Sequence, residues 1–235
     1  MVKYIDIDDV LRRCSYMNRL IVIEGLDGSG KSTQLEMLRE KLPDAHFITF
    51  PNYESNSGRL ITDYLNGTFA ETDPRKSSYS ASIMYAIDRY TSFRTDWGSL
   101  YNSGRPVISA RYVSSNAVYQ MTKLERTEWD SYLEWLCDLE YEKLGMPRPD
   151  MTVFLDMPTE ISQKLLIERY GGNENKRDIH ERDIAYLKHC REAAVYAAEK
   201  FGWETIDCSS GGAPRSKSGI NSELMNKIRC NIGTM

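Results

Sequence analysis

The chain has 235 residues, 41% of them hydrophobic and 27% charged, with a formal net charge of −4; this predicts a globular protein and disfavours a nucleic-acid-binding protein that is basic over its whole surface. No apolar run approaches the ~20 residues that span a bilayer, and the N-terminal residues lack the apolar centre of a secretory signal. The five cysteines are scattered without a C-x-x-C pair, so we expect a cytoplasmic protein with no membrane or nucleic-acid partner.

Short apolar runs alternate with longer helical patterns along the chain. The runs predict buried parallel strands at Leu20–Glu24, His46–Phe50, Val107–Ala110, Met151–Asp156 and Trp203–Cys208. Helices are predicted at Ser32–Leu42, Ser57–Leu65, Tyr79–Tyr101, Ser114–Lys143, Thr159–Arg169, Ile184–Phe201 and, more briefly, Ser222–Arg229. This alternation predicts an α/β fold of three layers, in which helices flank a five-stranded parallel sheet.

Two polar, glycine-containing stretches interrupt the pattern. They are Tyr170–Asp178 and Ser209–Gly219, and both are expected to be mobile. No repeat or linker divides the chain, so residues 1–235 are expected to form one domain. An N-terminal extension at 1–19 and a C-terminal segment at about 209–235 would flank its core.

A glycine-rich loop lies between the first predicted strand and the first predicted helix. Its residues are Gly25, Leu26, Asp27, Gly28, Ser29, Gly30, Lys31, Ser32 and Thr33. They match the P-loop pattern G-x-x-x-x-G-K-[ST], in which backbone N–H groups and a helix N-terminus hold phosphates. Lys31 is expected to reach the β- and γ-phosphates of ATP, and the Ser32 hydroxyl to bind Mg²⁺. A glycine turn that binds nothing is disfavoured, because a chance match has odds of about one in a hundred.

The P-loop alone does not separate a kinase from a GTPase or an ATP-driven motor. The guanine-reading motif N-K-x-D is absent from the sequence. Arginines recur near predicted strand ends and on helices, at Arg89, Arg111, Arg169, Arg177 and Arg182. Their guanidinium groups suit the roughly five phosphate charges that meet when a phosphoryl group passes between nucleotides. A surface position is the alternative for any single arginine.

Six ordered segments resemble the thymidylate kinase family, which phosphorylates dTMP with ATP. They are IEGLDGSGKST, FPNY (Phe50–Tyr53), YAIDRY (Tyr85–Tyr90), RYVSSNAVYQ (Arg111–Gln120), EKLGMPRPDMTVFLDM (Glu142–Met157) and KRDIHERD (Lys176–Asp183). The resemblance runs from about Leu20 to Asp207. It implies a P-loop kinase fold with a short lid, ATP and dTMP as substrates, Mg²⁺ as cofactor, and a homodimer.

The resemblance implies contacts to the thymine base. Phe50 and Pro51 would line the space for the thymine methyl group. Tyr85 would stack on the ring, where the family more often has phenylalanine. Arg89 would donate to O4, and Asn116 would bond the N3 edge. The alternatives from the residues alone are core packing for Tyr85 and a helix N-cap or first-turn position for Asn116.

The resemblance also implies contacts to the sugar and the phosphate of dTMP. Asp27 would accept from the deoxyribose 3′-hydroxyl, and Tyr119 would crowd the 2′ position and disfavour ribonucleotides. Arg111 would grip the 5′-phosphate. Tyr53 and His180 complete the implied dTMP site. On the helix that carries Arg89, the neighbouring Asp88 is a candidate ion-pair partner that orients it.

A lid is implied at about residues 169–182. Its basic residues are Arg169, Lys176, Arg177 and Arg182. Because Gly28 follows Asp27, this chain resembles the family members that carry their arginines in the lid rather than in the P-loop. Closure would exclude water and bring an arginine to the transferring phosphoryl group. The implied catalytic residues are therefore Asp27, Lys31, Arg111, Arg169 and Arg177, and an exposed charged loop is the alternative for the lid.

The sequence departs from the family pattern before Arg111. The family strand normally ends in Asp-Arg, and this chain has Ala110-Arg111. Without this aspartate, Asp27 or Glu181 would have to supply the carboxylate that positions Mg²⁺. Ser32 and Glu181 are thus the expected metal ligands. Asn52 also stands where relatives often carry an arginine, so one phosphate contact is expected to be missing.

Two alternative functions remain from the sequence. One is a nucleotide-binding homologue that lost catalysis with the aspartate at position 110. The other is a P-loop kinase for another deoxynucleotide, which YAIDRY and SSNAVY disfavour. For the homodimer, the predicted Ser114–Lys143 helix offers Tyr132, Trp135 and Leu139, residues that could equally belong to the core.

Overall fold

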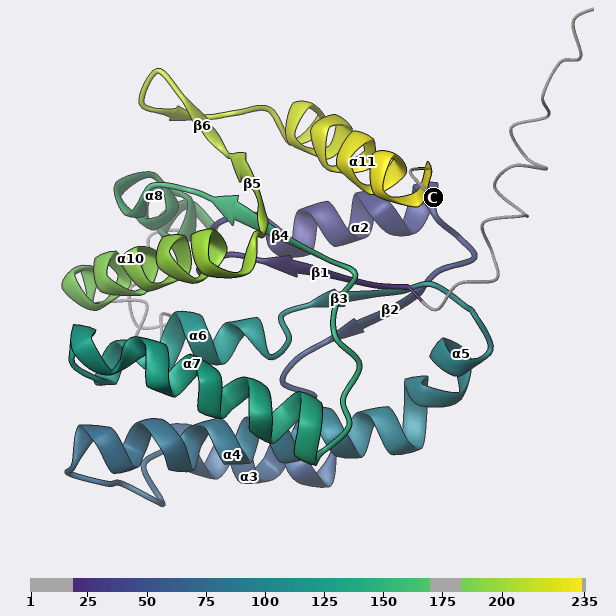
Figure 1. Cartoon of the computed structure of the whole chain (residues 1–235). Coiled ribbons are helices and arrows are strands. Elements are labelled where there is room, and N and C mark those ends of the chain that lie inside the picture. Colours follow the sequence, from purple (N-terminus) through teal and green to yellow (C-terminus); the bar gives the residue numbers. More distant parts are fainter. Residues whose placement is uncertain (1–18, 170–182, 234–235) are drawn as a thin grey trace, which may run out of the picture.

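The computed structural model describes residues 19–169 and 183–233, without the side chains of Arg169 and of residues 230–233. A five-stranded parallel sheet runs through it in the order β2-β3-β1-β4-β5 (Figure 1). The strands are β1 (Leu20–Glu24), β2 (His46–Thr49), β3 (Val107–Ala110), β4 (Met151–Asp156) and β5 (Glu204–Asp207). The predicted fold class is confirmed, and each strand lies where its apolar run predicts it.

Helices surround the sheet in the described part of the chain. The α-helices are α2 (Lys31–Lys41), α3 (Asn56–Leu65), α4 (Pro74–Ser92), α5 (Gly98–Asn102), α6 (Ser114–Tyr119), α7 (Trp129–Cys137), α8 (Thr159–Arg169), α10 (Ile184–Phe201) and α11 (Lys217–Gly233). The π-helical turns are η2 (Phe93–Trp97) and η5 (Asp138–Lys143), and the 3₁₀ turns are η3 (Met121–Lys123) and η4 (Arg126–Glu128). None of these helices is both long and apolar enough to cross a bilayer.

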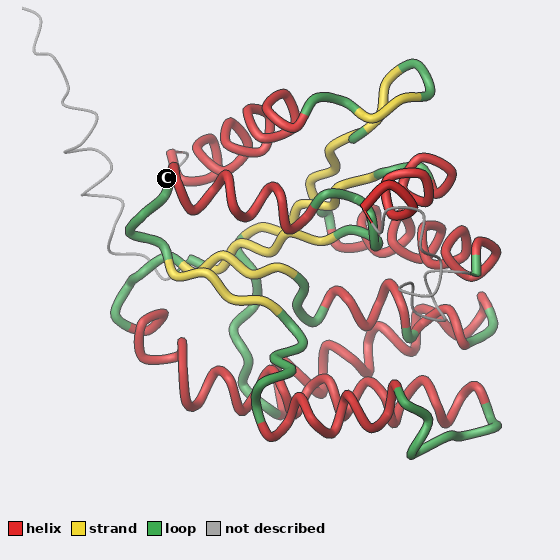
Figure 2. The backbone as a smooth tube through the Cα atoms, turned by 180° about the vertical axis from the view of Figure 1, so that it is seen from behind, coloured by secondary structure: helices red, strands yellow, loops and turns green. Residues whose placement is uncertain are grey.

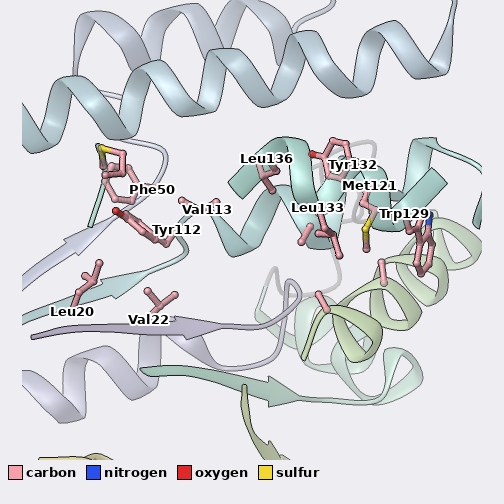
Figure 3. Packing of buried hydrophobic residues seen from close by; sticks show 14 of the residues in the cluster. Leu20, Val22, Phe50, Tyr112, Val113, Met121, Trp129, Tyr132, Leu133 and Leu136 are labelled. Atoms are coloured by element: carbon pink, nitrogen blue, oxygen red, sulfur yellow. The ribbon is translucent and has the colours of Figure 1, made fainter. Parts of the chain in front are cut away.

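The central strand β1 shows why the fold has three layers. Successive side chains of a strand point to opposite faces. Leu20 and Val22 therefore join an apolar cluster with α6 and α7 (Figure 3), whereas Ile21 and Ile23 join another with α2 and α11. Each fully buried side chain of this kind stabilises the fold by roughly 1.5–3 kcal/mol. The sheet is thus covered on both faces (Figure 2).

Strand register brings three loops to one edge of the sheet. Ile23 and Thr49 both align with Ala110. The N–H of Arg111 donates to the carbonyl oxygen of Ile23 at 3.1 Å, and that of Phe50 donates to Ala110 at 3.0 Å. The glycine-rich loop, the FPNY segment and Arg111 consequently begin side by side. Ligands of such sheets bind at this carboxyl edge.

The predicted single helix at Ser114–Lys143 is wrong. The chain forms α6, two 3₁₀ turns, α7 and a π-helical turn instead. Helical geometry stops because Leu124 adopts an extended backbone, and it restarts because Glu125 and Glu128 form a reciprocal capping box. Tyr132 is fully buried, and the ring of Trp135 packs 4.5 Å from that of Tyr79, centroid to centroid. Tyr132 therefore belongs to the core, and Trp135 is a partly buried residue that packs against it.

α4 begins earlier than the predicted helix at Tyr79–Tyr101. The Asp73 carboxylate accepts from the N–H groups of Arg75 at 3.0 Å and Lys76 at 3.4 Å, and Pro74 occupies the first turn. An aspartate followed by a proline is a helix-start signal that the sequence prediction missed. Beyond Ser92 the chain continues through η2 into α5.

The C-terminal part is more regular than predicted. Ser209–Ser210 (β6) pairs antiparallel with Ala213–Pro214 (β7) across two glycines with positive φ angles, as a tight hairpin requires. The last helix, α11, is longer than the predicted Ser222–Arg229. It is fixed to α2 by a buried contact from the Asn221 Nδ2 to the Gln34 Oε1 at 3.0 Å.

Candidate active site

The glycine-rich loop wraps around the amine of Lys31. Nζ of Lys31 donates to the carbonyl oxygens of Gly25 at 2.6 Å and Leu26 at 2.8 Å. Gly30, just before α2, has a left-handed backbone with φ of 91°, which favours glycine. Residues 32 and 33 follow in the first turn of α2. A lysine and the positive end of a helix thus lie together, an arrangement that binds phosphate.

Gly28 packs directly against α8. Its φ is 80°, and a Cβ atom there would lie 2.7 Å from the carbonyl oxygen of Ser162. An arginine at position 28 would therefore displace α8, so the P-loop of this chain leaves no room for one. The implied lid residues lie outside the described part of the structure: Lys176, Arg177, His180, Glu181, Arg182 and the side chain of Arg169.

The environment of Lys31 disfavours its charge in the free protein. Burial, with a further contribution from the Arg111 guanidinium, lowers the pKa of the Lys31 amine to about 8, against the opposing effect of Asp27 and Glu24. The amine is therefore charged below about pH 8 and increasingly neutral above it. Bound phosphates would favour the charged form.

We expect ATP binding to weaken as pH rises through about 8, because the neutral amine must then take up a proton to meet the phosphates. Calorimetry at pH 7, 8 and 9, in buffers of different ionisation enthalpy, measures both the affinity and the proton uptake. Lys31→Arg stays charged throughout and is the control. Equal slopes for the wild type and this variant would contradict the assignment.

A cavity of about 200 Å³ opens beside the loop. It is lined by every implied dTMP-binding residue of the described chain: Asp27, Phe50, Pro51, Tyr53, Tyr85, Arg89, Arg111, Asn116 and Tyr119. These residues come from the P-loop, the segment after β2, α4, the segment after β3, and α6. Residues far apart in the sequence thus form one pocket at the carboxyl edge of the sheet.

Arg111 occupies the wall between the cavity and the P-loop. Its Nη2 donates to Oδ1 of Asp27 at 2.5 Å, and its guanidinium lies 4.9 Å from the centre of the Tyr119 ring. Burial opposes the charge, but Tyr119 and Asp27 outweigh it and raise the pKa of Arg111. Its backbone has φ of 65°, unusual for a residue other than glycine. The Ser109 hydroxyl donates to its carbonyl oxygen at 2.5 Å and holds this conformation. Such strain is typical of functional sites.

Arg89 is held by Glu140, not by Asp88. Its Nε donates to Oε2 of Glu140 at 2.7 Å, and its Nη2 contacts Oε1. Both side chains are almost completely buried. Burial alone would lower the pKa of Arg89, but the ion pair with Glu140 outweighs it and raises the pKa. The prediction that Asp88 orients Arg89 is wrong.

Asp88 instead fixes the segment that follows β2. Its carboxylate accepts from the backbone N–H of Asn52 at 2.8 Å and from the hydroxyls of Ser57 at 2.7 Å and Ser55 at 3.1 Å. Asp88 precedes Arg89 on α4, so one turn of this helix holds both the FPNY segment and the arginine beside the cavity.

The core alternative for Tyr85 is not supported, whereas Asn116 lies in the first turn of α6 and also lines the cavity. Tyr85 is half-buried and lines the cavity, outside the apolar core clusters. Burial raises the pKa of its phenol. Asn116 lies inside α6, and its Nδ2 donates to the carbonyl oxygen of Ser82 and to Oε1 of Glu140, both at 3.4 Å. The N-cap position of α6 is Val113, so Asn116 is not the cap, but it does lie in the first turn of this helix.

Two buried carboxylates were missed in the sequence. Glu140 follows Leu133 and Leu136 at helical spacing, so its position on the apolar face was a usable signal. Glu24 ends β1 and accepts from the Ser115 hydroxyl at 2.7 Å. Ser115 in turn lines the cavity. The sequence around Ser115 contains several serines and did not indicate that one of them contacts Glu24.

The structure describes only one of the two expected Mg²⁺ ligands. Ser32 is exposed at the start of α2, and Glu181 lies outside the described residues. No group of three or more His, Cys, Asp or Glu side chains arranged for a metal ion occurs in residues 19–169 and 183–233. Ala110 belongs to the apolar cluster that also contains Ile21 and Ile23 of β1. This donor set suits Mg²⁺ held mainly by nucleotide phosphates and water.

The geometry can be compared with known proteins. The family model described as "Thymidylate kinase" matches residues 23–211. This chain belongs to the thymidylate kinase family. It is 34% identical to the thymidylate kinase of Mycobacterium tuberculosis over 188 residues, which cover 76% of this chain and 84% of that protein. It is 28% identical to a probable thymidylate kinase of Pyrobaculum aerophilum, covering 88% and 96% of the two chains.

A solved structure of thymidylate kinase from Candida albicans has the same fold. The TM-score is 0.68 at 23% identity, and the alignment covers 91% of this chain and 92% of the other. The sequence matches over most of the chain confirm the activity that the resemblance implied. The protein is a nucleoside monophosphate phosphotransferase, a dTMP kinase that uses ATP.

Proposed function

We propose that the cavity holds dTMP with its 5′-phosphate against Arg111, and that the P-loop presents the γ-phosphoryl group of ATP to it. The observation that supports this is the contact between Asp27 and Arg111. Asp27 is a P-loop residue, yet it lines the acceptor cavity. The donor and acceptor sites therefore share a wall, as in-line transfer requires.

The chain's own residues then act by binding and charge stabilisation. Lys31 turns from the carbonyl oxygens of its loop to the β- and γ-phosphates. Arg111 holds the acceptor phosphate, which is already a nucleophile at neutral pH, so no general base is needed. Asp27 accepts from the 3′-hydroxyl, and Tyr119 crowds the 2′ position. Arg169 and Arg177 of the proposed lid would add positive charge at the transferring group.

The proposed metal is Mg²⁺, which neutralises charge on the nucleotide phosphates when bound. The Ser32 hydroxyl at the start of α2 would hold it, with Glu181 as the proposed carboxylate ligand. We place the reaction in the cytoplasm, because the described cysteines Cys137, Cys190 and Cys208 are all free thiols. Residues 1–235 would act as one kinase domain.

The experiment that tests this proposal is an ADP-release assay with ATP, Mg²⁺ and a panel of acceptors: dTMP, dUMP, UMP, dCMP, dGMP and thymidine. We expect turnover with dTMP well above the others. Ala110→Asp is assayed in parallel, because Ala110 lies in an apolar cluster where the family pattern has a carboxylate. Activity in this variant alone would favour the nucleotide-binding homologue, and preference for another acceptor would overturn the dTMP site.

We also propose a homodimer through α4. Ile83, Ile87 and Tyr90 recur at helical spacing and are 44%, 42% and 38% exposed. Three large apolar side chains on one face of a helix suit burial against a second copy.

Ile87→Glu is therefore expected to shift the protein from dimer to monomer, because a charge would be buried at the centre of the contact. Light scattering after size exclusion measures the mass. Phe201→Glu, at a side chain of similar exposure (42%) on α10, is the control. A wild type that elutes as a monomer would contradict this proposal.

A further inference from the structure

The carboxylate of Glu140 lies behind the acceptor cavity and binds two of the residues that line it. Its side chain is completely buried. It accepts from Nε and Nη2 of Arg89, and its Oε1 also accepts from Nδ2 of Asn116 at 3.4 Å. Glu140 itself is absent from the cavity wall. One carboxylate thus connects α4 with α6 from the π-helical turn η5.

These contacts determine which atoms are left to face the cavity. The other terminal nitrogen of Arg89, Nη1, donates to the carbonyl oxygen of Tyr112 at 3.3 Å and carries a second N–H. Nδ2 of Asn116 is directed to Glu140 and to Ser82, which assigns Oδ1 to the cavity side. The wall therefore offers a donor from Arg89 next to an acceptor from Asn116.

We infer that Glu140 is a positioning residue that makes the site specific for a pyrimidine with a carbonyl group at C4 and an N–H at N3. Such a base offers an acceptor beside a donor, the complement of Arg89 and Asn116. A 4-amino pyrimidine offers the reverse pattern, so it would place donor against donor and acceptor against acceptor. This inference rests on the proposed function, because it assumes that the cavity holds the acceptor base.

The negative charge of Glu140 makes both of its oxygens hydrogen-bond acceptors. An amide in place of the carboxylate would turn an –NH₂ group toward Arg89 in either orientation, because both carboxylate oxygens accept from this arginine, and in one orientation toward Asn116 as well. The guanidinium would then lose one of its two fixed bonds, and with –NH₂ at the Oε1 position the Asn116 amide would lose its bond to residue 140 as well. Buried polar groups that no longer match a ligand discriminate poorly, whereas well-fixed ones reject a mismatched analogue strongly.

The test compares dTMP with 5-methyl-dCMP, which differ only at C4 and N3. Equilibrium binding is measured by calorimetry without ATP, and kcat and KM are measured separately. In Glu140→Gln we expect dTMP affinity to fall about tenfold, and the preference for dTMP over 5-methyl-dCMP to fall about tenfold or more. The kcat at saturating dTMP and the affinity for ATP should change by less than about threefold, because neither Arg89 nor Asn116 is placed at the phosphates.

Glu142→Gln is the matched control. Glu142 lies on the same turn η5 but is exposed and pairs with Arg148 at 2.8 Å. It should leave the base preference unchanged. Glu140→Asp keeps the charge but shortens the side chain by one methylene, so it should fold and show an intermediate preference. If Glu140→Gln fails to fold, the base preference of Glu140→Asp tests the inference in its place.

Separate outcomes distinguish this inference from the proposed function. A wild type that binds dTMP selectively without turnover would remove the kinase function and leave the inference in place. Turnover of dTMP with an unchanged preference in folded Glu140→Gln would overturn the inference alone. If only Glu140→Asp folds, a preference equal to that of the wild type would overturn it.

Discussion

Replacing Lys31 by alanine will reduce kcat for dTMP phosphorylation by about 10³-fold, the usual cost of removing a charged donor from a transferring group. The amine is the buried cation enclosed by the P-loop, within 2.8 Å of two of its carbonyl oxygens. Its loss leaves the developing charge on the phosphoryl group without that partner. Stopped-time assays with ATP and dTMP at saturation measure the effect.

Binding of dTMP to the Lys31→Ala variant serves as a second measurement. The cavity proposed for dTMP is lined by no part of Lys31, so binding of dTMP without ATP should change little. Lys227→Ala, which removes an exposed ion pair with Glu204, should retain wild-type kcat. A Lys31→Ala enzyme within about tenfold of the wild type would show that the lysine does not serve the transferring group.

Replacing Arg111 by alanine will reduce kcat/KM for dTMP by about 10²–10³-fold. The guanidinium is held between Asp27 and the Tyr119 ring at the wall of the cavity. Without it, the two acceptor phosphate charges would meet Asp27 with no intervening cation. Arg111→Lys should recover only part of the loss, because an ammonium group cannot reproduce the planar fork. Steady-state kinetics with varied dTMP measure both.

Controls separate this effect from a change in folding. Arg105→Ala, at an exposed arginine that donates to the carbonyl oxygen of Asp44, should leave kcat/KM unchanged. Thermal melting of Arg111→Ala should show a folded protein, since alanine removes charge but leaves the sheet intact. An equal loss of kcat/KM for dTMP and of ATP affinity would argue against a specific role at the acceptor phosphate.

The fold was largely predictable because its strands are continuous apolar runs. Leu20–Glu24 and Met151–Asp156 were predicted to the residue, since a strand buried on both faces carries a hydrophobic signal in every position. The broken helix after β3 was not predictable in the same way. Leu124 is buried although its backbone is extended, so its apolar side chain continued the helical pattern past the real break.

The site was predictable where a motif fixes the residue and not where packing chooses the partner. The P-loop placed Lys31, and the family motifs placed Arg89 and Asn116. The partner of Arg89 was assigned to Asp88 because the two are adjacent in the sequence. Glu140 comes from a distant helical turn, and only the packing of α4 against α7 and η5 reveals that it reaches the guanidinium.

The strand order of the sheet also bears on how the chain folds as it is synthesised. The central strand β1 pairs with β3 and β4, which begin at Val107 and Met151. It emerges first but gains its second partner only when more than half of the chain has left the ribosome. Until then the backbone N–H and C=O groups along one edge of this strand have no partner strand and are open to wrong pairing. The glycine-rich loop that follows β1 is thus synthesised early, but the strand that carries it completes its pairing late.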